Sequence, residues 1–368
     1  MWTPGGARPR RRKALDHERE EDAPVSAVAV GNLPRDLPWN ELRKRIDESR
    51  MVLLASHVFP EADSLGSQVA LALHLRDLGK EVVVCNPTRP LPMCRFLEEL
   101  ARSERIPLVW GGDVDLDGVD LVVILDVSDW DHMGRLGSRL KASPVAKACL
   151  DHHAPQSLFT DLDLIDPAAS ATGEIVHGFL RASGVVPTPA MATALYASLV
   201  FDTGCFRLRN TKDETILLAA ELILRGASHA EICRRLFENE SYTRLELLRV
   251  ALGNLVSECD GRLAWTVVTE SNFQRTGTAF NDADGILDQL VMIAHLEVGI
   301  LFRDWDGGVK VTFRSKGEVD VAAIARSLGG GGRRTASGVL LAIPMREATD
   351  LVLPPIRREL NGPRGAAR

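Results

Sequence analysis

The chain has 368 residues, 45% of them hydrophobic, which is more than one ordinary core requires, so two domains are expected. Its formal net charge of −6 excludes a generally basic binder of long duplex nucleic acid. A polyanionic ligand must therefore be met by metal ions or by a local cluster of arginines.

The six cysteines are scattered and form no CxxC pair, which favours a reducing cytoplasm over a zinc ribbon or a disulfide framework. No apolar run reaches about 18 residues, so we expect no transmembrane helix. Residues 1–38, in which Gly, Pro, Arg and Glu are mixed, are predicted to be a disordered tail, with a nucleic-acid-binding arm as the alternative.

Apolar runs alternate with helical patterns from about residue 40 onward. The run MVLLAS is short and bounded by polar residues, and a helical pattern follows it. Strands that alternate with helices are typical of a parallel sheet covered on both faces. We predict strands at 51–56, 81–86, 121–126 and 145–151, and helices at 65–78 and 93–101.

After about residue 170 the spacing of apolar residues is helical, and a second set of strands then begins. This second set indicates a separate, smaller α/β domain. We predict helices at 171–183, 188–201, 213–225, 228–237, 240–257 and 319–328, and strands at 262–269, 298–304, 309–315 and 338–343. The predicted organisation is a first domain at 39–215, a helical linker at 216–257 and a C-terminal domain at 258–362.

Acids and histidines follow the predicted strands of the first domain at the points where these strands end. In an open parallel sheet, ligands bind beyond the carboxyl ends of the strands, so these side chains are expected at one edge. A helix end contributes one further acid. The residues are His57, Glu61 and Asp63 after the first strand, Asp126 at the end of the third, Asp151, His152 and His153 at the end of the fourth, and Asp202 at the end of the helix ATALYASLVF.

Each of these residues has a structural interpretation when it is taken singly. Asp63 suits a helix cap, Asp126 a turn, and His152 a surface position. Their joint occurrence at three strand ends favours a metal site instead. Carboxylates and imidazoles without a thiolate suit Mn²⁺, with Mg²⁺ as the alternative, better than structural zinc. The other six histidines, His229 among them, are given no role.

Four segments together resemble the motifs of the DHH phosphoesterase family. They are SHVFPEADSLGSQ, ILDVSD, LDHH and FDTGCFR, and the stretch VTFRSKGEVDVAAIARSLGGGGRRTASG resembles the DHH-associated C-terminal domain of that family. The resemblance covers roughly residues 40 to 345. The subgroup that it most resembles consists of nucleases of short oligoribonucleotides that also dephosphorylate pAp, which is adenosine with 3′ and 5′ phosphates.

The resemblance implies a role for each matching residue. Two divalent metal ions, with Asp126 bridging them, activate a water, so no Ser or Cys nucleophile is needed. His153 faces the substrate phosphate, and Asp151 orients its neighbours. The implied ligands of the first metal are His57, Glu61 and Asp126, and those of the second are Asp63, Asp126, His152 and Asp202.

The glycine run of the second domain allows a backbone turn in which several N–H groups surround an anion. A flexible linker is the alternative for such a run taken by itself. In the family this loop forms the substrate-binding wall across a cleft from the metals. The implied substrate-binding residues are Gly329, Gly330, Gly331, Gly332, Arg333, Arg314 and Ser315, together with His153.

The chain departs from the family pattern at two positions. The family usually has Asp where this chain has Glu61, and His where it has Arg333. Glu remains a metal ligand with a longer side chain. Arg still binds phosphate, and can do so through two hydrogen bonds at once, but it does not act as a neutral imidazole.

We therefore expect a two-domain α/β phosphoesterase that acts on short oligoribonucleotides or pAp, with its active site in the cleft between the domains. The alternative on the same scaffold is a phosphodiesterase of cyclic or linear dinucleotides. A binding-only protein is the alternative from another class, favoured by Glu61 and Arg333. We expect no membrane partner, and a homodimer is left open.

Overall fold

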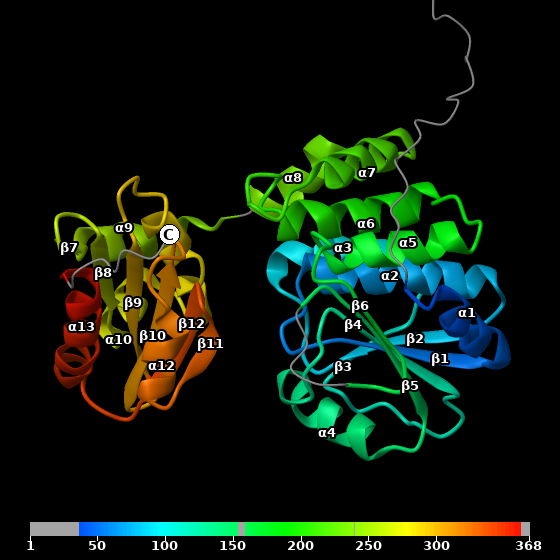
Figure 1. Ribbon diagram of the computed structural model, residues 1–368, viewed down its shortest axis with the longest axis horizontal. Helices are drawn as coiled ribbons and strands as arrows, with labels where there is room; N and C mark the ends of the chain where they lie inside the picture. The colour runs from blue at the N-terminus through cyan, green and yellow to red at the C-terminus, as the bar shows by residue number, and fades with distance from the viewer. Residues whose placement is uncertain (1–36, 154–158, 239, 362–368) are drawn as a thin grey trace, which may run out of the picture. The chain divides into compact units, whose positions relative to one another are not determined.

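The computed structural model describes residues 37–153, 159–238 and 240–361. The predicted tail therefore lies almost wholly outside the described residues. The chain divides into two compact units after residue 239, and each unit is described by itself (Figure 1). Among the helices that the structure describes, none combines the length and the apolar character that crossing a membrane requires.

The first unit contains a six-stranded, fully parallel sheet, as the sequence predicts. The four predicted strands occupy its centre, where continuous apolar runs are buried on both faces. The strands are β1 (Met51–Ala55), β2 (Glu81–Asn86), β3 (Leu108–Trp110), β4 (Leu121–Leu125), β5 (Ala146–Asp151) and β6 (Asp163–Ile165), in the order β3-β2-β1-β4-β5-β6.

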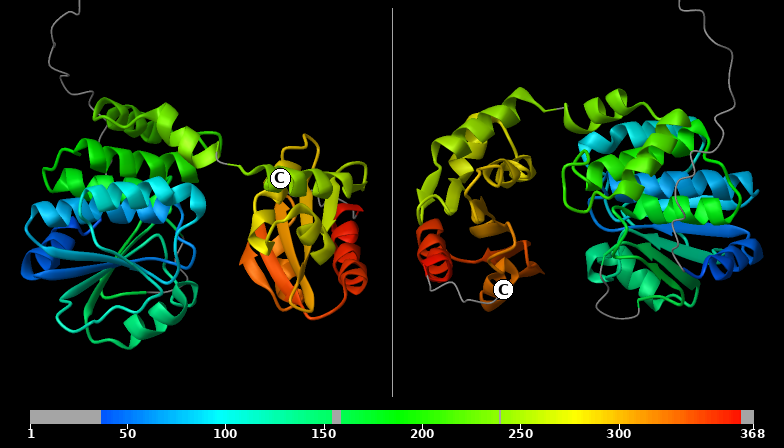
Figure 2. Two further views of the ribbon diagram at one scale, coloured as in Figure 1. Left: turned by 180° about the vertical axis from the view of Figure 1, so that it is seen from behind. Right: turned by 45° about the horizontal axis from the view of Figure 1, so that its top comes forward.

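Helices cover both faces of this sheet, and one face carries more of them than the other. The core beneath α2, α5 and α6 is large, whereas α4 packs on the opposite face with a smaller core (Figures 1 and 2). The helices are α1 (Trp39–Glu48), α2 (Ala62–Asp77), α3 (Arg95–Ser103), α4 (Gly134–Ala142), α5 (Thr172–Ala182), α6 (Pro189–Asp202), α7 (Asp213–Leu224) and α8 (His229–Phe237), with 3₁₀ turns at Pro92–Cys94 and Asp131–Met133. Helices α7 and α8 pack against α6 and so belong to this unit.

The second unit is built on a mixed sheet whose two faces have separate cores. Helices α12 and α13 pack on one face, and α9, α10 and α11 on the other. The strands are β7 (Val256–Glu258), β8 (Leu263–Val268), β9 (Val298–Trp305), β10 (Gly308–Ser315), β11 (Gly331–Arg333) and β12 (Ala336–Leu341), in the order β11-β12-β10-β9-β8-β7. The helices are α9 (Tyr242–Gly253), α10 (Glu270–Thr276), α11 (Ile286–Leu290), α12 (Val321–Ser327) and α13 (Met345–Asn361), with a 3₁₀ turn at Phe280–Ala283.

The glycine run is only partly the loop that the sequence predicts. Gly329 ends the turn after α12 with φ +84°, but Gly331 and Gly332 lie in the edge strand β11, which pairs with β12. A Cβ on Gly332 would come within 2.5 Å of the Ser337 Cα, so the close strand pairing requires glycine there. On Gly331 a Cβ would meet no atom within 4 Å. The run thus supplies both a turn and an open strand edge.

A glycine also sets how closely α2 approaches α6. A Cβ on Gly66 would lie 2.4 Å from the Ala194 carbonyl oxygen, which is backbone and cannot move aside independently. We predict that Gly66→Ala lowers the free energy of unfolding of the first unit by about 1–3 kcal/mol, the cost of overpacking, as measured by urea denaturation.

The matched control is Gly253→Ala on α9, where a Cβ meets no atom within 4 Å. That variant should be as stable as the wild type or more stable by up to about 1 kcal/mol, since Ala favours helix. If the two variants had equal stability, the proposed close contact of α2 with α6 would be wrong.

Candidate metal centre

The parallel sheet brings the predicted acids and histidines to one edge. Strands β1, β4 and β5 are neighbours and run in the same direction, so the residues after their carboxyl ends meet. The first turn of α2 and the last residue of α6 reach the same place. The donor atoms form three overlapping groups, each within 4.8 Å: His57, Glu61 and Asp126; Asp63, His152 and Asp202; and Asp126, Asp151, His152 and His153.

Asp126 lies at the centre of these groups. It follows β4 with φ +62°, a left-handed conformation that Asp tolerates better than most residues. Its N–H donates to the Leu150 carbonyl (3.0 Å), which fixes the turn. One carboxylate oxygen is 3.4 Å from His57 Nε2 and the other is 3.7 Å from His152 Nε2. A single buried carboxylate therefore faces both histidines.

His57 is oriented by its own neighbour in the chain. Its Nδ1 is 2.8 Å from the Val58 carbonyl, which only a protonated Nδ1 can contact favourably, so the Nε2 lone pair faces Asp126. Burial lowers the pKa of His57 and keeps the imidazole neutral, as a ligand must be. The carboxylate of Glu61 reaches the same group despite its extra methylene.

His152 presents a buried nitrogen that has no hydrogen-bond partner in the described structure. This Nε2 is 3.3 Å from Asp202 Oδ2 and 3.7 Å from Asp63 Oδ2, while Nδ1 faces the Ala169 carbonyl at 3.3 Å. With Nδ1 protonated, Nε2 is a lone pair that faces acceptors only. Buried polar atoms are rarely left in this state, and a cation among them would satisfy all three side chains.

The charges of the group repel one another. Burial, and after it the neighbouring carboxylates of Asp63, Glu61, Asp202 and Asp151, raise the pKa of Asp126 well above the usual range of an aspartate. A bound cation reverses this balance, because it favours the ionised carboxylates. Both the orphaned nitrogen and the crowded acids thus fit divalent cations at this edge.

Asp63 is held by residues that sequence patterns did not single out. Its carboxylate accepts hydrogen bonds from Thr172 N (2.8 Å) and Gly173 N (3.1 Å) at the start of α5, and from Ser198 Oγ (2.6 Å) on α6. Gly173 is needed because a Cβ would lie 2.1 Å from Ser198 Oγ. The available signals were a Thr-Gly pair at a helix start and a serine within the apolar helix α6.

Asp151 and His153 form a separate pair beside this group. The Asp151 carboxylate accepts from His153 N (3.1 Å) and contacts His153 Nδ1 at 2.7 Å. Burial opposes the ionisation of Asp151, but the hydrogen bonds from His153 outweigh it and lower its pKa. With Nδ1 used in this way, Nε2 of His153 is left to contact a ligand.

The predicted residues of the second unit are divided between the two faces of its sheet. Arg314, Ala336 and Arg333 are directly paired across β10, β12 and β11, so the two arginines share one face with a small residue between them. Ser315 is next to Arg314 on β10 and points to the opposite face, where its Oγ accepts from Gly317 N (3.0 Å). The structure thus groups the arginines and turns Ser315 away from them.

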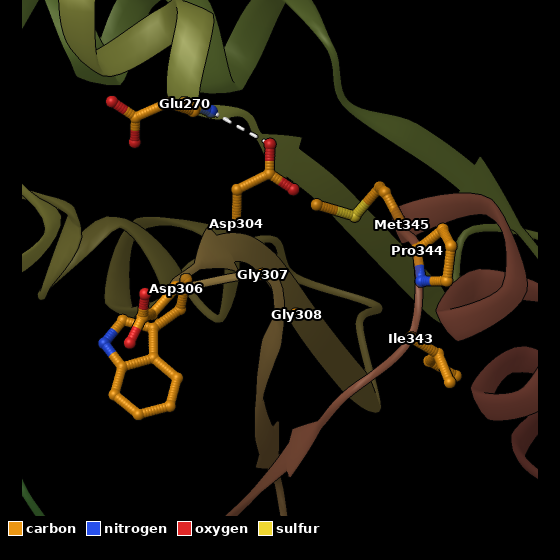
Figure 3. Close-up of a pocket in the computed structure, with 9 residues that line it drawn as sticks. Glu270, Asp304, Asp306, Gly307, Gly308, Ile343, Pro344 and Met345 are labelled. Atoms are coloured by element: carbon orange, nitrogen blue, oxygen red, sulfur yellow. Dashed lines mark hydrogen bonds between the residues drawn. The ribbon is translucent and has the colours of Figure 1, made fainter.

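A hollow in the second unit is less suited to a phosphate than the face that carries Arg314 and Arg333. It lies at the turn between β9 and β10, and Glu270, Asp304 and Asp306 line it together with Met345 (Figure 3). One of these carboxylates, Asp304, accepts from the Glu270 backbone N–H (2.9 Å). Three acids would repel an anion, so we do not assign substrate to this hollow.

The contact from Ser198 to Asp63 generates a prediction. Ser198→Ala removes the 2.6 Å hydrogen bond to Asp63 and should weaken Mn²⁺ binding about 10–100-fold, the usual cost of losing an outer contact. Calorimetric titration of chelator-treated protein measures this. Ser103→Ala, at an exposed serine that donates to the Leu100 carbonyl, is the control and should bind Mn²⁺ as the wild type does. Unchanged affinity in Ser198→Ala would remove Ser198 from the site.

The chain is similar in sequence to known domains and proteins over most of its length. Residues 51–199 match the N-terminal domain of the DHH family, and residues 262–350 match the DHHA1 domain. The chain is 31% identical over 340 residues to the bifunctional oligoribonuclease and PAP phosphatase NrnA of Thermus thermophilus, covering 90% of this chain and 98% of that one. It is 26% identical over 314 residues to the cyclic-di-AMP phosphodiesterase GdpP of Geobacillus thermodenitrificans, covering 82% of this chain and 46% of that one.

Among solved structures, an exopolyphosphatase-related protein from Bacteroides fragilis has a similar fold. The TM-score is 0.78 at 22% sequence identity, and the match covers 88% of this chain and 95% of that one. The DHH match contains every site residue of the first unit except Asp202, which lies just beyond its end, and the DHHA1 match contains the arginine row of the second unit. The chain belongs to the DHH family.

Proposed function

We propose that this protein is a metal-dependent phosphoesterase that hydrolyses short oligoribonucleotides, pAp or both. The observation that carries the proposal is the meeting of two donor groups at Asp126, one of which contains the unpartnered Nε2 of His152. The NrnA relative, which matches over nearly its whole length, supports the choice of substrates.

The donors suit two divalent ions, and Mn²⁺ in particular, because they are carboxylates and imidazoles without sulfur. Such ions would polarise phosphoryl oxygens and lower the pKa of a water. Mg²⁺ is the alternative. The residues proposed to hold one ion are His57, Glu61 and Asp126, and those proposed for the other are Asp63, Asp126, His152 and Asp202.

His153 is proposed to contact the phosphate under attack. The Asp151 carboxylate accepts a hydrogen bond from Nδ1–H of His153. This contact fixes the orientation of the ring and leaves Nε2 available to a ligand. In the imidazolium form, in which both ring nitrogens carry a proton, a hydrogen bond from Nε2–H to a phosphoryl oxygen would stabilise charge that develops there.

The arginine row of the second unit is proposed to bind the rest of the nucleotide. Arg314 and Arg333 flank Ala336 on one face, so a flat or anionic group can lie between two guanidinium groups without a large side chain in its way. The open edge at Gly331 adds backbone contacts. We also propose a reducing, cytoplasmic setting, which the six free thiols support.

The alternative substrate class is a cyclic or linear dinucleotide. The GdpP relative favours it, although this chain spans about half the length of that protein. A binding-only protein would keep the fold and lose turnover. A hydrolysis panel with Mn²⁺, containing pAp, dinucleotides, longer oligonucleotides, cyclic dinucleotides and pyrophosphate, separates these possibilities.

Asp126→Asn tests the proposed bridge. Asn has the same shape and also tolerates the left-handed backbone, so the fold should persist while both ions lose a charged ligand. We expect turnover of pAp to be abolished. Asp129→Asn, at a half-exposed aspartate nearby, is the control and should keep wild-type activity. If Asp126→Asn retained about a tenth of the wild-type rate, the two-ion assignment would fail.

Arg333→Ala tests the substrate role of the second unit. Loss of a charge-assisted hydrogen bond should weaken nucleotide substrates by about 1.5–3 kcal/mol in kcat/KM, whereas p-nitrophenyl phosphate should be hydrolysed as before. Arg326→Ala on the exposed side of α12 is the control and should leave both substrates unaffected. An equal loss on both substrates in Arg333→Ala would mean that Arg333 acts at the reacting phosphate or on the fold.

A further inference from the structure

Two cysteines and a histidine meet at a second place in the first unit, apart from the carboxylate group. Cys205 lies in the turn that ends α6, and His229 and Cys233 lie one helical turn apart on α8, which packs against α6. Their donor atoms all lie within 4.8 Å of one another. The spacing in sequence follows no familiar metal motif, and only the fold brings these residues together.

The distances between these donors suit a tetrahedral zinc ion. The two Sγ atoms are 3.8 Å apart, and Cys233 Sγ is 3.5 Å from His229 Nδ1 and 3.7 Å from Nε2. Tetrahedral zinc, with bonds of about 2.3 Å to sulfur and about 2.05 Å to nitrogen, places two sulfurs about 3.8 Å apart and a sulfur and a nitrogen about 3.6 Å apart. The Cys205–Cys233 and Cys233–His229 pairs therefore already have the spacing of neighbouring corners of such a site, and all three donors lie within 4.8 Å of one another.

The histidine is oriented from behind by a buried tyrosine. Tyr196 is 1% exposed, and its hydroxyl is 2.7 Å from His229 Nδ1. When Nδ1–H donates to the tyrosine oxygen, the lone pair of Nε2 is left for a ligand. Outer contacts of this kind commonly orient histidines that bind metals.

The backbone at Cys205 adopts an unusual conformation. Cys205 and Phe206 have φ +59° and +61°, and Cys205 N donates to the Val200 carbonyl (2.7 Å) at the helix end. Two successive non-glycine residues in the left-handed region are costly, and such conformations tend to persist where a site requires them. Here the conformation places the Cys205 thiol against Cys233.

We propose that Cys205, His229 and Cys233 bind one zinc ion, which fastens α8 to the end of α6 and leaves a fourth position for water. Both thiols lose their protons to solvent when the ion binds. His229 is exposed, so an ion can reach the site directly. Cys205 follows Asp202 by three residues. The bound zinc ion therefore also stabilises the end of α6 that carries Asp202.

A disulfide between the two cysteines is the competing interpretation. Burial, and after it the contact with Cys205, raise the pKa of the Cys233 thiol. A thiol with a raised pKa reacts slowly with oxidants in the absence of a metal. The geometry decides between the two interpretations: the Sγ atoms are 3.8 Å apart, far beyond the about 2.05 Å of a disulfide bond, and a disulfide gives no role to the imidazole 3.5 Å from Cys233.

Cobalt(II) provides a test whose signal the carboxylate site cannot produce. Bound to thiolate, cobalt(II) gives a sulfur-to-metal charge-transfer absorption, and the carboxylate group contains no sulfur. The full-length protein, reduced and freed of metal, should develop this band on titration with cobalt(II) and lose it when zinc is added. Absence of the band in the reduced wild type would overturn the proposal, and a Cys205–Cys233 disulfide then found by mass spectrometry would assign the pair to redox chemistry.

Cysteine variants identify which thiolates give rise to the cobalt(II) band. Cys233→Ser and Cys205→Ser should lose it, whereas Cys259→Ser, at a partly exposed thiol of the second unit, should keep it. Zinc should raise the melting temperature of the wild type and of Cys259→Ser but not of Cys233→Ser. If Cys233→Ser fails to fold, as judged by circular dichroism, Cys205→Ser replaces it. Persistence of the full band in folded Cys205→Ser or Cys233→Ser protein would place the thiolate site elsewhere.

Discussion

The feature on which the site depends is a buried concentration of negative charge at the carboxyl edge of the first sheet. Asp126 is buried among other carboxylates, and its pKa is raised accordingly. His57 and His152 direct Nε2 at this carboxylate, and burial lowers the pKa of His57, so the His57 ring adds a lone pair and no compensating charge. A divalent cation is the group that offsets this repulsion, and the same cation is what phosphoester hydrolysis requires.

Close packing of the helices around the sheet holds these mutually repelling side chains in a defined geometry. Glycines at positions 66 and 173 let α2, α5 and α6 approach closely, and this approach directs the first N–H groups of α5 at Asp63. A helix N-terminus favours a carboxylate, so these N–H groups hold the Asp63 side chain in place before any metal arrives. The same packing carries Asp202 at the end of α6 to the sheet edge. The fold thus holds the proposed ligands in position even though their charges repel one another.

The sequence predicts the centre of the first sheet and the acids and histidines at its strand ends, because long apolar runs and their termini are local signals. It does not predict the three-residue strands β3 and β6, whose existence depends on pairing with neighbours. Thr172 and Ser198 escape sequence reasoning because they lie more than a hundred residues from Asp63 and are common residue types. The thiol cluster escapes it because only the packing of α8 against α6 brings Cys205 to Cys233, which lies 28 residues further along the chain. Gly331 is assigned to a loop from composition alone, but strand pairing decides its conformation.

The central claim is that Asp126 joins two metal ions in one site. Electron paramagnetic resonance of the metal-free protein titrated with Mn²⁺ tests this claim directly, because two ions about 3.5–4 Å apart are magnetically coupled. The account predicts that a coupled spectrum grows as the second equivalent is added and that hydrolysis of pAp appears with it. A spectrum of isolated Mn²⁺ at every ratio, with full hydrolytic activity, would contradict the account.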